Sequence, residues 1–561
     1  MINIQKKIEE ILLAHTGLEQ KVDIAPDYTG ADFTSNAGFL LAKAKRENPS
    51  LVATQIAEVL KSDPSITDII ERVEVVGNGF MNFFVRDEVL LEELGTIISK
   101  NENYGKDYMG KGKTVVVEYS SPNIAKRFGI GHLRSTIIGQ AIYNLYKFLG
   151  YHVLGDNHLG DWGTQFGMVL AQITRKHLNV EDLNVEDLER LYVEFNQEMK
   201  DTPELRDEAK AWFKKLEDGN KEARKIWQNV REVSMREFSI IYDLLNVHID
   251  NAHPESFYED KMSAVLEEVR QKGLSKESQG AQIFEFTNLP PALLIKSDGS
   301  TTYFSRDLAQ VKFRIKEWNP DVFIYEVGVD QKLHFMQLFG AVKLLGWMGD
   351  KEFVHVAHGL IRFKEGKMST RQGKTIHLDE VLLEAITRAR HIIEQSKKSR
   401  GLDEKTKEAV AKAVGISAIK YFDLSHHPAS DIIFDWEKLF VLEGNSAPYL
   451  QYTFARTQSV QAKTANTPLI KMVAPLNKEE KRLLQLLTHF ASVLQSAARE
   501  YSPNILCSFL FELAQCYNAF YTQHKIIGSP EEGLRLALTC ATGIVLKNGL
   551  TLLGIDTPER M

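Results

Sequence analysis

The chain has 561 residues, of which 43% are hydrophobic and 25% charged, and its 68 lysine and arginine residues against 75 aspartate and glutamate residues give a formal net charge of −7. This is an ordinary globular balance, and the length corresponds to about three to four domains. Three scattered cysteines exclude a disulfide framework and a cysteine-type zinc site. The first residues lack the apolar core of a secretory signal, and no run of about 18 apolar residues exists, so we expect a cytoplasmic protein with no membrane partner.

The first part of the chain, residues 1–105, is expected to form a small α+β domain. Apolar residues recur at helical spacing between 36 and 62. A β-hairpin is predicted over 73–85, because two apolar runs flank a Gly-Asn-Gly sequence that is typical of a tight turn.

The middle of the chain, residues 106–385, shows the strand–helix alternation of a parallel, doubly wound α/β sheet. A charged, strand-poor stretch at about 175–285 interrupts it and is expected to be a helical insertion. This stretch contains the pentapeptide LNVED twice, which we interpret as a local duplication without function. The expected strands are 114–117, 153–155, 292–296, 321–327 and 353–357, and the expected helices are 133–148, 305–317 and 331–345.

The last part of the chain is expected to be all-helical, with a connector at 386–435 and a helical module at 436–561. The charged segment 395–413 is expected to be exposed to solvent. The module carries 12 lysine and arginine residues against 10 acidic ones, a net charge of +2, so the excess acid lies in the rest of the chain.

The sequence EYSSPNIAKRFGIGHLRSTIIG, at 118–139, places a loop with proline and glycine between a strand and a helix. A helix N-terminus presents free N–H groups and the positive end of the helix dipole, which favour a phosphate. Gly129 and Gly131 allow a close approach of the backbone. His132 can donate to a phosphate oxygen, and Lys126 adds a positive charge. A plain strand-to-helix connection is an equally good interpretation of this spacing alone.

A second motif, GKMSTRQGK at 366–374, gathers Lys367, Arg371 and Lys374 among glycine and serine residues. A flexible basic loop of this kind can close on phosphates. On its own, the same composition is also typical of an exposed basic turn.

Together the two motifs resemble the signatures of class I aminoacyl-tRNA synthetases. GIGH at 129–132 is similar to their HIGH motif, and KMSTR at 367–371 is similar to their KMSKS loop, in the same order at the two ends of an interrupted Rossmann-type sheet. Five further segments, distributed along the chain, resemble arginyl-tRNA synthetases in particular. They are SSPNIAK, GDNHLGDWGTQFG, YFSRDLA, VGVDQKLHFMQ and APYLQYTFAR.

This resemblance implies a reaction and an architecture. Arginine and ATP, with magnesium, would give arginyl-adenylate and pyrophosphate, and the arginyl group would then pass to the terminal ribose of tRNA(Arg), with activation requiring bound tRNA. The family implies a monomer without a protein-bound metal. Its additional domain, which touches the tRNA elbow, corresponds to 1–105, with the loops 28–36 and 75–84 as candidate contacts. Its anticodon-binding domain corresponds to 436–561.

Recognition of arginine must hold a rigid, planar fork of five donors, which needs carboxylates and a planar partner. Tyr303 and Asp307 are four residues apart and share one helix face, and the resemblance places both at the guanidinium. It also implies Asn123 and Gln331 near the amino and carboxylate groups, with Glu118 nearby. Lysine would be rejected, because an ammonium cannot pair with two carboxylate edges in one plane. Without the resemblance, Asp307 is also interpretable as a helix N-cap.

The other predicted site residues contact ATP or RNA. Lys126, His132 and Lys367 are predicted to be catalytic, through positioning and positive charge rather than through a nucleophilic side chain. The aromatic and arginine side chains of the C-terminal module suit stacking on unpaired bases. The predicted ATP-binding residues are Lys126, Gly129, Gly131, His132, His334, Lys367, Met368 and Ser369, and the predicted tRNA-binding residues are Tyr449, Tyr452, Arg456 and Met561.

Two positions depart from the family motifs. Gly129 replaces the first histidine of HIGH, which removes one phosphate donor, so a backbone N–H or a neighbouring residue must replace it. Thr370 replaces the second lysine of KMSKS, and the resemblance implies that Lys126 compensates for it.

Several alternatives stay open at this point. His158 is expected either near the adenylate or in a structural loop, while His355 and His358 are expected to be ordinary strand residues rather than metal ligands. Another class I synthetase, such as the cysteinyl enzyme, is disfavoured by the lack of zinc-type cysteines. An inactive paralogue that only binds RNA or a partner is favoured by Gly129 alone. No second hydrolytic domain is evident, so editing is not expected.

Overall fold

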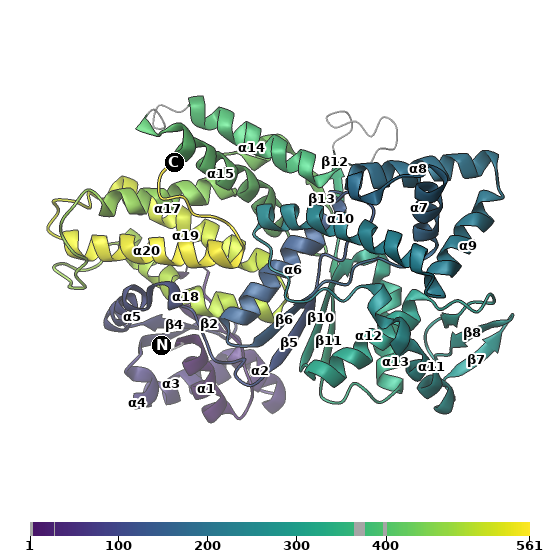
Figure 1. Ribbon diagram of the computed structural model, residues 1–561. Helices are drawn as coiled ribbons and strands as arrows, with labels where there is room; N and C mark the ends of the chain where they lie inside the picture. The colour runs from purple at the N-terminus through teal and green to yellow at the C-terminus, as the bar shows by residue number, and fades with distance from the viewer. Residues whose placement is uncertain (1–3, 27–28, 364–375, 396–400) are drawn as a thin grey trace.

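The computed structural model describes residues 4–26, 29–363, 376–395 and 401–561 (Figure 1). Its first part is a small α+β unit that lies below the C-terminal helices in that view. Four strands form an antiparallel sheet in the order β1-β2-β4-β3, and the predicted hairpin is confirmed as β3 and β4. The elements of this unit are α1 (Ile4–Thr16), β1 (Val22–Ile24), β2 (Phe33–Ser35), α2 (Ala37–Lys45), α3 (Pro49–Leu60), α4 (Pro64–Thr67), β3 (Ile70–Val76), β4 (Phe80–Val85) and α5 (Asp87–Lys100).

Four parallel strands form the central sheet in the order β11-β10-β5-β6. The chain changes direction at β5, because β6 lies on one side of it and β10 and β11 lie on the other. In such sheets, ligands bind at this switch point, outside the carboxyl ends of the strands. The strands are β5 (Thr114–Glu118), β6 (His152–Asp156), β10 (Val322–Gly328) and β11 (Glu352–His358), close to the predicted ranges.

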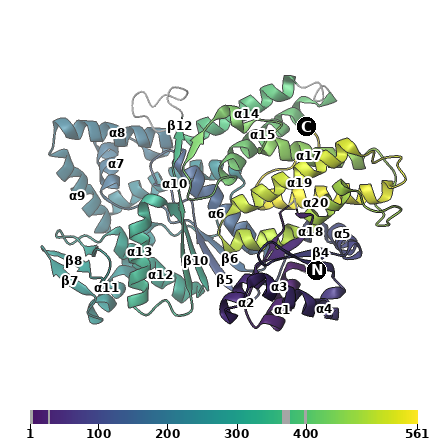
Figure 2. The ribbon, with the colours of Figure 1, turned by 180° about the vertical axis from the view of Figure 1, so that it is seen from behind.

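Helices cover both faces of this sheet (Figure 2), which confirms the doubly wound α/β prediction. Alternate residues of a strand point to opposite faces. Ile324 packs in the same core as α6 (Gly131–Phe148). Its neighbour Tyr325 packs in a second core with α12 (Tyr303–Trp318) and α13 (Lys332–Leu344).

The insertion between β6 and α12 is helical, as predicted, but it also holds a three-stranded antiparallel sheet in the order β7-β8-β9. The strand predicted at 292–296 forms as β9, but its expected place in the parallel sheet is wrong, because it pairs with β8. An apolar run identifies a strand and leaves its partner open. The elements are α7 (Thr164–Arg175), η3 (Val180–Asp182), α8 (Val185–Asp201), α9 (Leu205–Glu217), α10 (Lys221–Leu245), η4 (Glu255–Lys261), α11 (Met262–Gln271), β7 (Ser275–Ser278), β8 (Ala281–Phe284) and β9 (Ala292–Ile295).

The rest of the described chain is helical except for one short strand. β13 (Ile432–Phe434) pairs in parallel with β12 (Ile361–Phe363), so the all-helical prediction is wrong there. The prediction of an exposed segment at 395–413 is also wrong in its second half, because Val410 is buried in one cluster with Ala389 while the charged side chains face outward. No helix among the described residues is long and apolar enough to cross a membrane. The helices are α14 (Leu378–Gln395), α15 (Glu404–Leu424), α16 (Trp436–Leu439), α17 (Ala447–Gln461), α18 (Lys478–Arg499), α19 (Pro503–Gln523) and α20 (Glu532–Leu552).

Candidate active site

A buried ion cluster closes the carboxyl ends of β5 and β6. The Glu118 carboxylate lies 2.6 Å from a guanidinium nitrogen of Arg314, and the same nitrogen lies 2.8 Å from Asp156. Burial alone would lower the pKa of Arg314, but the two carboxylates raise that pKa above its ordinary value. Glu118, predicted to lie near arginine, is therefore already paired within the protein and forms part of the floor of the site.

Asp307 lies between two histidine rings above this floor. Its Oδ2 atom is 2.6 Å from Nε2 of His334, and its Oδ1 atom is 3.6 Å from Nε2 of His158. α12 begins at Tyr303 with Thr302 as its N-cap. Asp307 therefore lies more than one turn inside the helix, and the N-cap interpretation of this residue is wrong.

Charge and burial together set the ionisation of this group. Burial alone would raise the pKa of Asp307, but the hydrogen bond and charge of His334, with the charge of His158, hold it below its ordinary value. Burial would lower the pKa of His158, but the carboxylates of Glu118 and Asp307 raise it. Asp307 is therefore an ionised carboxylate, which is the form that pairs with a cation.

The other predicted arginine contacts lie at the same edge of the sheet. Tyr303 is 58% exposed, and its ring centroid lies 4.9 Å from that of His334. Gln331 is exposed at the end of a 3₁₀ turn that follows β10. Asn123 is exposed on the loop after β5, where its backbone pairs with Gly160. The structure therefore joins Tyr303 to Asp307 through His334, and it leaves Asn123 and Gln331 on separate loops.

The first motif ends in the N-terminus of α6, which begins at Gly131. The Nδ1 atom of His132 accepts a hydrogen bond of 3.3 Å from the N–H of Gly129. In the neutral ring the proton is then on Nε2, which can donate to an anion. Burial lowers the pKa of His132, and the charge of Lys126 lowers it further. His132 is thus a neutral donor near pH 7.

Lys126 lies on the 119–126 loop, which connects β5 to the first motif. Its Nζ atom is 4.7 Å from the ring centroid of Tyr192, on α8 of the insertion. A cation–π contact of a half-exposed lysine contributes about 0.5–1 kcal/mol. That is weak enough for the ammonium to exchange the ring for a phosphate.

The second motif lies outside the described residues, so the structure does not place Lys367, Met368, Ser369 or Thr370. The described chain resumes at Ile376, whose carbonyl accepts a hydrogen bond of 2.9 Å from the N–H of Ile130. The next residue, His377, forms an antiparallel bridge with Gly129. The chain therefore returns from the second motif directly beside the first.

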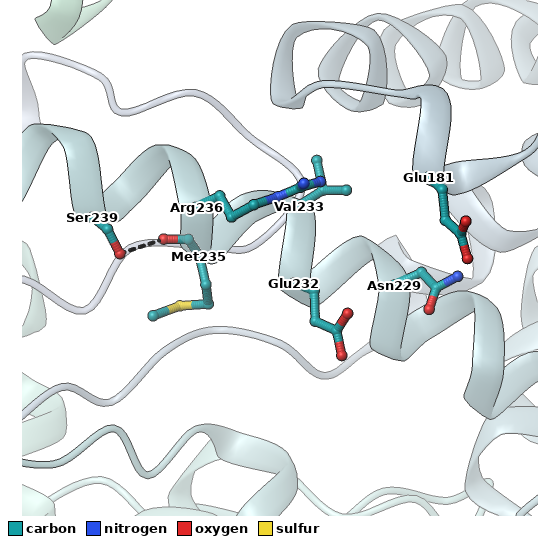
Figure 3. Close-up of a pocket in the computed structure, with 7 residues that line it drawn as sticks. All are labelled: Glu181, Asn229, Glu232, Val233, Met235, Arg236 and Ser239. Carbon is teal, nitrogen blue, oxygen red and sulfur yellow. Dashed lines mark hydrogen bonds between the residues drawn. The ribbon is translucent and has the colours of Figure 1, made fainter.

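An open hollow of about 610 Å³ on the outer face of α10 is separate from these residues (Figure 3). Glu232, Arg236 and Ser239 of α10 line it, with Glu181 of η3 opposite. None of its lining residues is a predicted site residue, so the hollow is distinct from the candidate active site.

The histidines of β11 have protein partners. Nδ1 of His358 lies 3.0 Å from Glu326, and Nε2 of His355 lies 3.1 Å from the carbonyl of Val327. Among the residues placed by the structure, no three histidine, cysteine, aspartate or glutamate side chains are grouped to hold a metal ion.

Three family models together match almost the whole chain. The model "tRNA synthetases class I (R), catalytic domain" matches residues 93–436, "Arginyl tRNA synthetase N terminal domain" matches 2–85, and "DALR anticodon binding domain" matches 450–561. The arginine–tRNA ligase of Streptococcus uberis is 42% identical over 530 residues, which cover 93% of this chain and 92% of the relative. The chain belongs to the arginyl-tRNA synthetase family.

Two further comparisons agree with this assignment. The arginine–tRNA ligase of Clostridioides difficile is 38% identical over 568 residues, covering 100% of this chain and 98% of that protein. The solved structure of Thermus thermophilus arginyl-tRNA synthetase superposes with a TM-score of 0.84 at 25% identity, and both chains are covered completely. The resemblance to arginyl-tRNA synthetases and the predicted multidomain fold are confirmed, and the comparisons do not support the inactive paralogue.

In this arginyl-tRNA synthetase, three of the residues predicted to bind tRNA lie on α17. The guanidinium of Arg456 lies 4.9 Å from the ring centre of Tyr452 and 4.8 Å from that of Tyr521, on α19. Tyr449 lies one turn before Tyr452 on the same helix. Met561 is separate from them and packs against the buried cluster of α14 and α15. Tyr521 is 38% exposed and completes this aromatic cluster.

Three residues that support this synthetase site were not predicted from the sequence. Arg314 follows Asp307 by seven residues, so both lie on one face of α12 two turns apart, and this spacing was the available signal. Ser234 and Tyr242 of α10 support the 119–126 loop through hydrogen bonds. No local pattern indicates these two contacts, because they join segments more than 100 residues apart.

Proposed function

We propose that this arginine–tRNA ligase activates arginine with ATP and transfers it to tRNA(Arg) through the residues described above. The observation that carries the proposal is the ionised carboxylate of Asp307 at the switch point of the sheet. With Oδ2 held by His334, the Oδ1 atom stays 3.6 Å from His158 and is open to a new donor. An ionised carboxylate beside the exposed ring of Tyr303 suits a planar cation.

Arginine binds in this proposal with its guanidinium against Asp307 and Tyr303. Asn123 and Gln331 position its amino and carboxylate groups, because both are exposed at the same edge of the sheet. Glu118 stays paired with Arg314 and keeps the floor of the site rigid. Lysine is rejected, because its ammonium cannot satisfy Asp307 in the bidentate, planar way of a guanidinium.

ATP binds with its magnesium ion, as one substrate, along the N-terminus of α6. A carboxylate oxygen of arginine attacks the α-phosphorus, the bond from that phosphorus to the bridging oxygen breaks, and pyrophosphate leaves with the electron pair. Positive charge and fixed donors stabilise the charge that develops on the phosphoryl oxygens. The residues proposed for this role are Lys126, Gly129, Gly131, His132, His334, Lys367, Met368 and Ser369. His334 also holds Asp307 on the arginine side of the site.

The arginyl group then passes to the terminal ribose of tRNA(Arg). The anticodon loop contacts Tyr449, Tyr452, Arg456 and the carboxyl end at Met561, and the N-terminal unit contacts the tRNA elbow. Arginine activation depends on bound tRNA, as the family resemblance implies. The enzyme is proposed to act as a monomer in the cytoplasm.

The test is arginine-dependent exchange between ATP and labelled pyrophosphate, with and without tRNA(Arg). We expect exchange with arginine and tRNA, little exchange without tRNA, and none with lysine. Exchange in neither condition would overturn the ligase mechanism and leave an RNA-binding paralogue. Equal exchange with and without tRNA would overturn only the claim of tRNA dependence.

A further inference from the structure

The 119–126 loop is held in a strained backbone conformation. Ser120, Ser121 and Ala125 have φ angles of 74°, 48° and 61°, in the left-handed region that non-glycine residues rarely adopt. Non-glycine residues keep such a conformation only where the surrounding structure enforces it. This loop precedes the first motif and carries Lys126, so its shape sets where the phosphate contacts lie.

Side chains of α10 enforce this conformation. The Tyr242 hydroxyl lies 2.9 Å from the Ser120 hydroxyl. Tyr242 also accepts a hydrogen bond of 2.9 Å from the amide of Asn157, whose oxygen accepts one of 3.0 Å from the N–H of Ser121. Eight residues before Tyr242 on α10, Ser234 accepts a hydrogen bond of 3.0 Å from the N–H of Ala125. Every strained residue of the loop is thus tied to α10, directly or through Asn157.

The far end of α10 is tied to the C-terminal module by a buried lysine. Lys420 of α15 is 1% exposed, and its ammonium donates to the carbonyl of Leu245, the last residue of α10. The same ammonium donates to the carbonyl of Gly554 over 2.6 Å. Gly554 ends α20 with a φ angle of +66°, and a Cβ atom there would lie 2.6 Å from the ammonium. Lys420 therefore joins the carboxyl ends of two helices from different parts of the chain.

Helix α10 links the helical insertion to the C-terminal helices. Figure 1 shows α10 reaching from the insertion to the yellow C-terminal helices. Glu232, Arg236 and Ser239 of α10 border the open hollow of Figure 3, while Phe238 and Tyr242 of the same helix pack in the core. Burial lowers the pKa of Lys420 to about 7. A buried amino group that lost one of its two carbonyl partners would leave a donor unpaired, so this contact favours movement of the two helix ends together.

We propose that α10 couples tRNA binding on the C-terminal helices to the conformation of the 119–126 loop, with Lys420, Tyr242 and Ser234 as positioning residues. This inference rests on the proposed function, because it explains how tRNA could enable arginine activation. tRNA bound on α17 and α19 biases the position of α20. Lys420 passes that bias to the end of α10, and α10 then holds the loop in the strained shape that presents Lys126 to ATP.

The first test compares Lys420→Met with Lys412→Met, an exposed lysine on the same helix. We expect Lys420→Met to lower the turnover of tRNA-stimulated pyrophosphate exchange about tenfold, with the tRNA dissociation constant and the KM for arginine within about threefold of wild type. Lys412→Met should stay within about twofold on all three measures. A merely structural loss would lower the amount of folded enzyme and leave the turnover per folded enzyme unchanged.

The second test is a double-mutant cycle between Lys420→Met and Ser234→Ala. Leu245 and Ser234 lie about 16 Å apart along α10, and substitutions at that distance normally act independently. If α10 transmits the effect, the double variant should be no slower than the slower single variant. Tyr242→Phe removes one hydroxyl and serves as the third variant if Lys420→Met does not fold, with an expected loss of about fivefold in stimulated turnover.

Three outcomes in the variants would overturn the coupling. They are a fully additive double variant, an unchanged stimulated turnover in Lys420→Met, or loss of tRNA affinity that accounts for the whole effect. Wild-type exchange that does not depend on tRNA also overturns it and leaves the ligase activity standing. Absence of any wild-type exchange overturns the proposed function itself, so the two failures are distinguishable.

Discussion

The Asp307 carboxylate, which we propose to bind the arginine side chain, is held in place by two histidines. One oxygen is held by His334 at 2.6 Å, and the other lies 3.6 Å from His158, beyond hydrogen-bond distance. The two rings lower the pKa of the buried carboxylate, and the hydrogen bond from His334 fixes its orientation. A single side chain therefore combines low pKa, fixed orientation and one open acceptor.

Lys126 is the residue whose removal tests the phosphate side of the site. Lys126→Ala should slow formation of arginyl-adenylate by a factor on the order of 10² or more, because a preorganised positive charge near the transferring phosphoryl group is lost. Single-turnover kinetics with tRNA present measure this step. Lys111→Ala, at an exposed position outside the loop, is the control and should act like wild type. A normal rate of activation in Lys126→Ala would show that Thr370 is not compensated by this lysine.

Among the secondary-structure elements, the two copies of the pentapeptide LNVED have the same sequence but form different structures. Asn179 of the first copy accepts a hydrogen bond of 3.4 Å from Glu181 and caps only the three-residue turn η3. Asn184 of the second copy accepts one of 2.9 Å from Asp187, whose carboxylate accepts one from the N–H of Asn184, and this capping box begins α8. The two copies of LNVED therefore have different capping structures, although their sequences are identical.

The two copies allow a matched comparison of the same substitution at Asn184 and at Asn179. Asn184→Ala should destabilise α8 by about 1 kcal/mol, because the capping box satisfies two end donors of a long helix. Asn179→Ala should cost clearly less, since η3 has little helix to cap. Hydrogen–deuterium exchange of the α8 amides measures both. Equal exchange in the two variants would mean that packing against α7, rather than the cap, sets the stability of this end.

At the scale of the whole molecule, the N-terminal unit is built onto the C-terminal helices. His489 of α18 is 1% exposed, and its ring centroid lies 5.0 Å from that of Phe33 on β2. Neither ring nitrogen of His489 has a hydrogen-bond partner within the part of the chain that the structure describes. Lys481 of the same helix forms an ion pair with Asp87 at the start of α5. The N-terminal unit and the C-terminal helices, both proposed to contact tRNA, are therefore fixed to one another.

This interface should be acid-sensitive because of His489. Burial lowers the pKa of His489 from 6.5 to about 3. Below pH 6.5 the unfolded chain binds a proton there and the folded chain does not, so stability is complete above pH 6.5 and falls as the pH drops toward 3. At pH 5 the loss is about 2 kcal/mol.

His489→Leu should remove that loss. Thermal unfolding midpoints of wild type and variant should differ more in favour of the variant at pH 5 than at pH 7.5. His152→Leu, at an exposed strand position, is the control and should show no such difference between the two pH values. A variant whose midpoint falls with pH as steeply as that of wild type would contradict the assignment.

Charge distribution is the other property of the whole molecule. The net charge is −7, yet the 436–561 module carries +2. Since phosphate contacts release counterions, tRNA affinity should fall by at least about tenfold between 50 and 200 mM salt. Filter binding at these concentrations measures it. A flat response would mean that stacking, rather than charge, dominates the RNA contacts.

Features that depend on local pattern could be predicted from the amino-acid order alone. Helical and strand periodicity predicted the hairpin of the N-terminal unit, the strands of the parallel sheet and the helices beside them, because side-chain spacing along one segment reports its own amphipathicity. Motif residues identified the family, since residues such as Asn123, His132 and Tyr303 keep a fixed order along the chain. These signals are short-range and therefore readable without a structure.

The pairing of distant segments could not be predicted and became visible in the folded molecule. β9 pairs with β8 and β13 with β12, and neither partner follows from an apolar run. The pairing of Glu118 with Arg314 and the hold of α10 on the 119–126 loop join residues that are far apart in the chain. The same holds for ionisation, because the pKa of Asp307 depends on burial and on two histidines from other elements. Long-range packing sets these contacts, and no local pattern encodes it.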